Sequence, residues 1–236
     1  MVCWLDEVLA DLASVRRFGP AAVLVFAEYA RLVQAYGYEI PRVVWVREFA
    51  EHPPAEVRLH FMFRALDALR IGADALAEIA PALAAWKRLA DVGSVVPGDA
   101  LPELAAADGL VRGVFSRIQA QAASLVPAHQ AYTEAGFARA RVLAEQFAEG
   151  LAPSDRIDDD LRSTPVDLAD LFNAAAIVRW SPRLLDQLMT TMGVMTDEAL
   201  SDEHRRARAL RQLDELLARA IEGQRLRRAW PKGLDK

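Results

Sequence analysis

An all-helical fold is predicted by three features of this 236-residue sequence. Alanine is the commonest residue, with 44 copies, and Ala, Leu, Arg and Glu all favour helices. Proline and glycine interrupt the chain at intervals typical of helix boundaries. No stretch of five or more residues shows the convincing alternation of apolar and polar side chains expected of a strand. We therefore expect an all-α protein of about ten helices.

The first two predicted helices lie on either side of a breaker, Arg16–Pro20. The first covers about residues 4–15, and its apolar face is formed by Leu5, Val8, Leu9 and Leu12. The second begins at Pro20, because proline suits the first helical position, and it extends to about residue 35. The first helix could pack on its own core. Alternatively, it could be an arm that docks into a groove on another copy.

The remaining helices are delimited by prolines and polar loops. Pro41 and Pro53-Pro54 suit helix starts, and Ser181-Pro182 combines a capping serine with a proline at the first position. Residues 91–102 and 150–165 are predicted to be loops. The predicted helices cover about residues 42–50, 54–71, 74–89, 110–125, 128–149, 167–178 and 182–193, and a last helix begins at Thr196 or Ser201 and extends to about residue 228.

The charge of the chain is acidic overall, with 28 Lys and Arg against 33 Asp and Glu. A protein that coats nucleic acid is usually basic, so this balance counts against such a role. However, residues 201–236 carry ten Lys and Arg against six Asp and Glu. Of the 28 basic residues 25 are arginine, whose planar guanidinium matches phosphate geometry.

Neither catalysis nor a cofactor is indicated by the residue pattern. The sequence lacks a phosphate-binding loop, a dinucleotide glycine fingerprint and a GxSxG motif. The one cysteine, Cys3, excludes a disulfide within the chain, and the four histidines show no metal-ligand spacing. Because these motifs are missing, we expect that the protein is not an enzyme. No signal peptide or membrane-spanning run is visible, so we expect it to be soluble and intracellular.

Five motifs in order resemble the nucleoprotein of phleboviruses and their phenuivirus relatives. The first motif is Gly37-Tyr38-Glu39-Ile40-Pro41-Arg42-Val43, and the second is Arg70 with Gly72. Ser116-Arg117-Ile118 begins an alanine-rich helix, and Gln146-Phe147 precedes Pro153 and Arg156. Asn173-Ala174-Ala175 precedes Gly193-Val194. The resemblance covers most of the chain and includes its length.

The resemblance implies a two-lobed helical nucleoprotein with an extended N-terminal helical arm. Residues 1–35 would form the oligomerisation arm, residues 36–122 the N-terminal lobe and residues 123–236 the C-terminal lobe. The groove between the lobes would hold single-stranded genomic RNA. The arm would dock on a neighbouring copy through Leu5, Val8, Leu9 and Leu12, building rings or filaments that the viral RNA polymerase copies. The expected locations are the virion and the host cytoplasm.

The resemblance also assigns RNA-binding residues. Arg70, Arg117 and Arg156 would face phosphates, Tyr38 would lie at the base-binding slot, and Ala174 and Ala175 would form its wall. Arg64 is added because it lies near these positions in the sequence. The Ala- and Arg-rich composition and the acidic charge leave one alternative open. That alternative is a bacterial all-helical interaction or regulatory protein that binds no nucleic acid.

Overall fold

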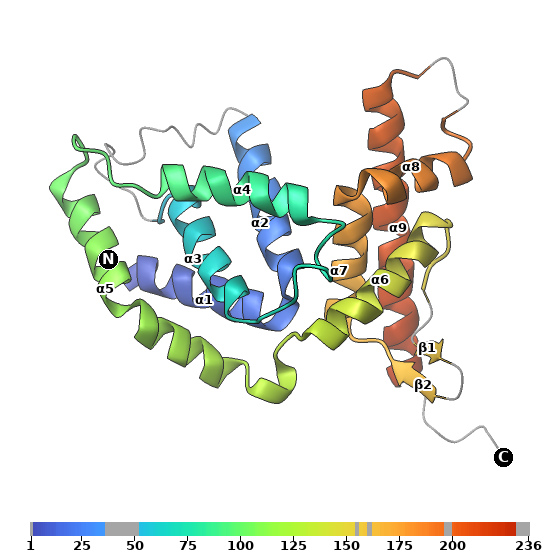
Figure 1. Cartoon of the computed structure of the whole chain (residues 1–236), viewed down its shortest axis with the longest axis horizontal. Helices are drawn as coiled ribbons and strands as arrows, with labels where there is room; N and C mark the ends of the chain where they lie inside the picture. Colours follow the sequence, from blue (N-terminus) through green and yellow to red (C-terminus); the bar gives the residue numbers. More distant parts are fainter. Residues whose placement is uncertain (1, 36–51, 154–155, 160–161, 196–199, 230–236) are drawn as a thin grey trace. The chain divides into compact units, whose positions relative to one another are not determined.

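The computed structural model describes residues 2–35, 52–153, 156–159, 162–195 and 200–229. These residues form nine α-helices and one two-stranded hairpin, so the predicted helical fold is confirmed (Figure 1). The chain divides into two compact units, residues 1–133 and 134–236, which we call unit 1 and unit 2. The predicted boundary at residue 122 falls inside a helix, and residues 1–35 belong to unit 1.

Unit 1 contains five α-helices: α1 (Val2–Phe18), α2 (Pro20–Ala35), α3 (Ala55–Asp67), α4 (Ala80–Gly93) and α5 (Pro102–Leu125). The second helix starts at the predicted proline. Two starts differ from the prediction, because residues 74–79 form turns before α4 and α5 begins already at Pro102. In α4 and α5 a proline lies in the first turn, where its missing N–H costs no hydrogen bond.

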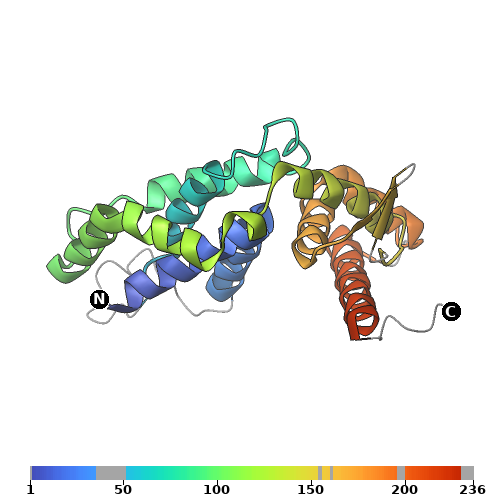
Figure 2. The same ribbon diagram turned by 90° about the horizontal axis from the view of Figure 1, so that it is seen from below.

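Helix α1 lies in the core of unit 1. Its side chains Trp4, Val8, Leu12 and Val15 are at most 2% exposed, and they recur at the spacing of one helix face. The helix packs against α2, α3 and α5, and Figure 2 shows it running alongside α5. The extended N-terminal arm is therefore not confirmed. Because Val8 and Leu12 are covered by their own unit, they offer no docking face in this structure, while Leu5 and Leu9 are half-buried.

The breaker between α1 and α2 is held by close contacts. Gly19 has φ of +59°, and a Cβ at this position would lie 2.3 Å from the ring of Tyr132. The backbone N–H of Tyr132 donates to the carbonyl of Arg16 at 2.8 Å, and the Arg16 side chain donates to the carbonyl of Val126. These contacts join the turn between α1 and α2 to the segment after α5, so the turn is packed within unit 1.

Unit 2 is built around α7 (Leu168–Trp180). Its neighbours are α6 (Glu134–Ala148), α8 (Pro182–Thr191) and α9 (Asp202–Ala229). Nine residues of α7 are buried, and the helix begins with a capping box formed by Asp167 and Asp170. Asp170 is also paired with Arg139 of α6 at 2.9 Å. The predicted cap of α8 is confirmed, because the Ser181 side chain accepts from the backbone N–H of Leu184.

A short hairpin occupies part of the predicted polar loop 150–165. Strands β1 (Arg156–Asp159) and β2 (Arg162–Pro165) pair antiparallel, with Ile157 opposite Thr164. Strands of four residues are too short to show a clear alternation, which explains why the sequence predicted a loop here. No described helix is both long and apolar enough to cross a membrane.

Candidate nucleic-acid interface

Three of the predicted RNA-binding arginines lie in unit 1, and all three side chains are exposed. Arg64 is in the last turns of α3, Arg70 follows that helix, and Arg117 is in the second half of α5. None of them forms an ion pair with any residue that the structure describes. Other arginines of the unit are paired: Arg31 with Glu28, Arg58 with Asp11, and Arg112 with Asp108.

Arg64 lies over an aromatic stack that joins α3 to α5. The rings of Phe61 and Phe115 are parallel to within 22°, with centroids 5.0 Å apart. The guanidinium carbon of Arg64 is 4.1 Å from the Phe115 centroid, and that of Arg112 is 5.7 Å from the Phe61 centroid. A guanidinium over a ring still has its N–H groups at the edge, where they can donate to phosphate oxygens.

The two stacked arginines differ in the donors they have left. The Nε of Arg112 donates to Asp108 at 2.6 Å, and its Nη2 donates to the carbonyl of Ser94 at 2.6 Å. The guanidinium of Arg64 makes no hydrogen bond with the described part of the chain, so its donors face solvent. Arg64 is thus the arginine of this cluster that can bind an external anion.

Arg70 projects from a tight turn that closes α3. Its φ is +55°, a left-handed conformation that side chains other than glycine rarely adopt. Its backbone N–H donates to the carbonyl of Asp67 at 3.2 Å, satisfying one of the last carbonyls of the helix. The side chain of Arg70 is exposed at this turn.

Arg117 does not lie on the same side of α5 as Arg64. It lies two residues after Phe115 on α5, and two residues rotate a helix by about 200°. Since Arg64 covers Phe115, Arg117 points to the other side of α5. The structure therefore brings Arg64 to an aromatic cluster but does not assemble the predicted arginines into one patch.

The RNA-binding residues predicted in unit 2 are not exposed in the way that the arginines of unit 1 are, where the structure describes their side chains. Ala174 is 0% exposed and Ala175 is 8% exposed, because both lie in the core around α7. Small side chains there let neighbouring helices approach closely, and the expectation that Ala174 and Ala175 form the wall of an RNA slot stays a prediction. Arg156 begins β1, and its side chain lies outside what the structure describes. Tyr38 lies outside the described residues.

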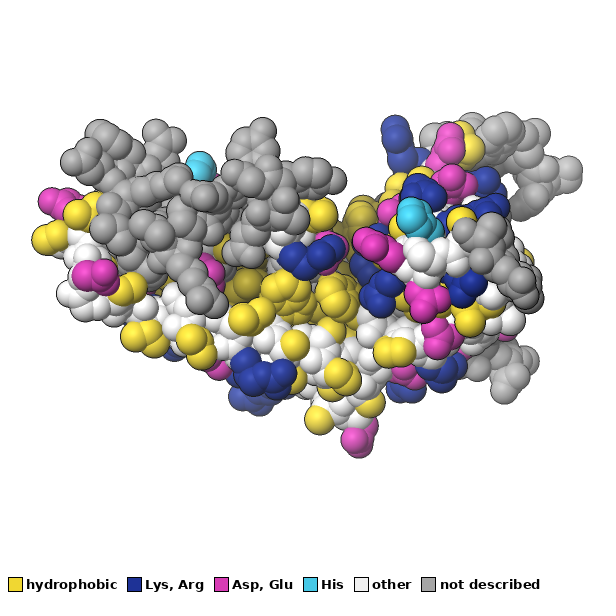
Figure 3. All heavy atoms as spheres, turned by 90° about the horizontal axis from the view of Figure 1, so that it is seen from above, with side chains coloured by type: hydrophobic (Ala, Val, Ile, Leu, Met, Phe, Trp, Pro, Cys, Tyr) yellow, Lys and Arg dark blue, Asp and Glu magenta, His cyan; other side chains and the backbone are white. Residues whose placement is uncertain are grey.

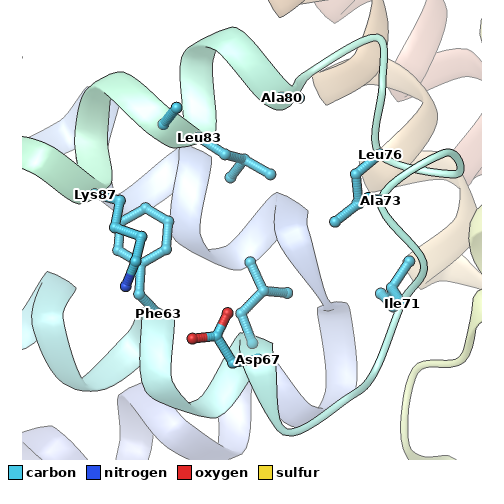
Figure 4. A pocket seen from close by; sticks show the side chains of 10 residues that line it. Phe63, Asp67, Ile71, Ala73, Leu76, Ala80, Leu83 and Lys87 are labelled. Carbon is cyan, nitrogen blue, oxygen red and sulfur yellow. The ribbon is translucent and has the colours of Figure 1, made fainter.

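A pocket of about 330 Å³ opens between α3, residues 71–76 and α4 (Figure 4). Buried apolar side chains form its floor, and small or half-exposed ones form much of its rim. Two charged side chains, Asp67 and Lys87, also line it. The full lining consists of Phe63, Leu66, Asp67, Ile71, Ala73, Leu76, Ala80, Leu83, Ala84 and Lys87.

The sequence analysis did not identify this pocket, although α4 contains a signal for it. Ala80, Leu83, Ala84 and Lys87 recur at helical spacing, so they share one face. A face with two alanines opposite a second helix leaves space that larger side chains would fill. The chain 71–76 closes that space from a third side, and no sequence pattern predicts such a contact.

His60 lies at the junction of α3 and α4. Its Nδ1 is 3.3 Å from Asp91 Oδ1, and its ring meets Phe61 edge-on. Burial lowers the pKa of His60 below its ordinary value, and the nearby guanidinium groups of Arg112 and Arg64 act in the same direction, while Asp91 opposes them. The imidazole is therefore mainly neutral at pH 7 and leaves the positive charge of this region to the arginines.

Where the structure describes unit 2, some of its arginines are paired with acidic side chains. Arg179 pairs with Asp214 of α9 at 2.7 Å, and Arg205 pairs with Asp202 at 3.0 Å. On the face drawn in Figure 3, the surface of unit 2 shows blue and magenta side chains next to each other. Positive charge mixed with acid in this way is typical of a solvated surface.

Within the residues that the structure places, no three His, Cys, Asp or Glu side chains come together as a metal site. No known protein family, curated protein or solved structure matches this chain.

Proposed function

We propose that this chain is a nucleoprotein that binds single-stranded RNA and coats it together with further copies of itself. Its place of action would be the virion and the host cytoplasm, and the viral RNA polymerase would be its partner. The order of five sequence motifs supports this proposal. The all-helical fold and the two compact units are compatible with it.

The observation that carries the proposal is the state of Arg64. This residue combines an exposed guanidinium, an aromatic support at 4.1 Å and donors that no described side chain uses. Such a group can bind a phosphate on one edge without first breaking an ion pair. Arg70 and Arg117 are also exposed, and neither forms an ion pair with a carboxylate of the described chain. Each can therefore add a phosphate contact of its own.

Self-association needs a face other than the buried one of α1. Helix α2 offers Val25, Tyr29 and Leu32, which are 62%, 61% and 39% exposed and lie four and three residues apart. These positions form one stripe on the helix and fall within residues 1–35, the segment expected to join copies. In this proposal the stripe contacts a second copy, and the buried face of α1 serves only the fold of unit 1.

The proposal is tested by purifying the chain without nuclease and measuring its mass by size-exclusion chromatography with light scattering. We expect a large particle with a high ratio of absorbance at 260 nm to that at 280 nm. Treatment with RNase should lower the ratio and reduce the mass. A nucleic-acid-free monomer or dimer, unchanged by RNase and unable to bind added single-stranded RNA, would overturn the proposal.

A second candidate is an all-helical interaction or regulatory protein that binds no nucleic acid. The net charge of −5 favours it, because a polyanion is repelled by an acidic chain. The ion pairing of Arg31, Arg58 and Arg112 favours it as well, since these side chains are already used. The same chromatography separates the two candidates.

A further inference from the structure

We propose that the pocket between α3 and α4 is a nucleobase subsite in which Asp67 selects guanine over the other bases. This inference rests on the proposed binding of single-stranded RNA and adds a base preference to it. All lining residues belong to unit 1, so the site is complete within one compact part of the chain. The proposal follows from the size of the pocket and from the two charged side chains, Asp67 and Lys87, that line it.

The size and lining of the pocket suit a planar ring. Its volume of about 330 Å³ is at the lower end of the range for small-molecule sites. Phe63, Leu66 and Leu83 are 3%, 6% and 8% exposed and form an apolar floor with one aromatic ring. The rim residues Ala80 and Ala84 carry only methyl groups, which leaves the entrance open. A base can therefore bury its faces against apolar side chains and keep its polar edge at the rim.

Asp67 gives the rim its selectivity. Figure 4 shows its carboxylate and the ammonium of Lys87 on the same side of the pocket, flanking Phe63. No ion pair joins Asp67 to any other described residue, and an ionised carboxylate can only accept hydrogen bonds. Guanine presents a ring N–H and an amino group side by side, which match the two carboxylate oxygens. Uracil presents one N–H between two carbonyl oxygens, and those oxygens would face the negative charge.

One cation, Lys87, lines the pocket, and a second, Arg70, follows its acidic residue in the sequence. The Nζ of Lys87 is 5.6 Å from the Phe63 centroid and 3.8 Å from Asp91, and the side chain is half-exposed. Arg70 follows Asp67 by three residues and is exposed without a carboxylate partner among the described residues. Both can donate to a phosphate or to the guanine carbonyl oxygen.

The charged residues at the rim also argue against a ligand with an apolar chain and a single carboxylate, such as a fatty acid. Its carboxylate would be attracted by Lys87 but repelled by Asp67 at the same rim. A guanine nucleotide offers donors to Asp67 and an anion to Lys87, so both charges are used. The combination of an acid and a base at one apolar pocket is the reason for preferring a nucleotide.

The experiment measures binding of GMP, AMP, CMP and UMP to the full-length, RNA-free protein by isothermal titration calorimetry. We expect GMP to bind about 10-fold more tightly than UMP, as one bidentate contact provides. Asp67→Asn should remove this preference, while Asp74→Asn, which changes an exposed acid outside the pocket, should keep it. Ala84→Trp should fill the entrance and abolish binding of all four nucleotides. Ala106→Trp, at an exposed alanine of α5, is its matched control.

A parallel measurement with oligouridine RNA, with and without one central guanosine, separates this inference from the proposed function. Binding of both RNAs with equal affinity, unchanged in Ala84→Trp, overturns the pocket and leaves the nucleoprotein proposal standing. A guanine preference of the mononucleotides that Asp67→Asn removes, without any RNA binding, supports the pocket and overturns the nucleoprotein. Absence of both kinds of binding overturns both.

Discussion

The guanidinium of Arg58 on α3 holds both carboxylate oxygens of Asp11 on α1, with its Nε and Nη2 each 2.7 Å from one oxygen. Its Nη1 lies 2.7 Å from Glu7, and its Cζ lies 4.4 Å from the ring centroid of Phe26 on α2. One arginine therefore ties three helices together. This network fixes α1 inside unit 1, together with the apolar face that the helix buries.

Replacing Arg58 with Met should lower the free energy of unfolding by about 3 kcal/mol at pH 7, because it leaves the Asp11 carboxylate buried without its partner. Burial raises the pKa of Asp11, and Arg58 opposes this shift, so its removal raises the pKa further. The folded state then favours the protonated acid. The contribution of Asp11 to stability is complete below its ordinary pKa of 3.8. It is lost as the pH rises through the pKa that Asp11 has in the folded state.

We therefore expect the deficit of Arg58→Met to shrink as the pH falls from 7 to 4, measured by urea denaturation. Arg31→Met, which removes an exposed pair with Glu28, should change stability by less than about 1 kcal/mol. A deficit that is independent of pH would show that the loss comes from packing on Phe26 and not from the charge of Asp11.

Trp4→Ala should lower the free energy of unfolding by about 3–5 kcal/mol, since the ring is 2% exposed and its loss leaves a cavity. Deleting residues 2–18 should expose the apolar surfaces of α3 and α5 and cause aggregation. Thermal melting and light scattering would measure both effects, with the exposed Cys3→Ala as a control. A truncated protein that stays folded and monomeric would instead support the arm.

Substituting Arg64, Arg70 and Arg117 with Ala should weaken binding of single-stranded RNA at least about 100-fold, taking roughly 1 kcal/mol for each phosphate contact. The slope of affinity against salt concentration should also decrease, because fewer counterions are released. The charge-matched control replaces three exposed arginines of α9, namely Arg206, Arg211 and Arg225. Equal losses in both variants, measured by fluorescence anisotropy, would point to a general charge effect.

Arg70→Gly should stabilise the fold by about 0.5–1 kcal/mol, because glycine adopts a φ of +55° without the steric cost that Arg70 bears. The same change removes an exposed cation, so RNA binding should become weaker while the melting temperature rises. Weaker RNA binding together with a higher melting temperature would indicate that Arg70 serves RNA binding at the expense of stability. A variant that melts earlier than the parent would contradict the strain at this turn.

Acidification should destabilise unit 1 through His60. The pKa of His60 is lowered in the folded state. The contribution of this residue to stability is therefore present above its ordinary pKa of 6.5 and is lost as the pH falls through its pKa in the folded state. The charge of the protonated ring would be opposed by Arg112 and Arg64 and partly compensated by Asp91. Hydrogen exchange of α3 and α4 should therefore accelerate less between pH 7 and 5 in His60→Gln than in the parent, after correction for intrinsic rates.

The candidate site was only partly predictable from sequence. The exposure of Arg64, Arg70 and Arg117 agrees with a role at the surface, whereas Ala174 and Ala175 are core residues. A buried alanine and a surface alanine in a helix look alike in sequence, because only the neighbouring helices decide which one is covered. The pocket was missed for the same reason, since it depends on residues 71–76 meeting α4.

The helical class and several helix ends were predictable because they depend on local chemistry. These ends are the start of α2 at Pro20, the cap of α8 at Ser181 and the turn at Gly19. The contacts of each helix face, in contrast, depend on how the helices pack in three dimensions. The apolar face of α1 fits a core or a partner equally well by periodicity, and it lies in the core here through its packing on α3 and α5 and the pairing of Arg58 with Asp11. Local propensity depends on neighbours within one or two turns, whereas burial depends on residues far apart in the chain.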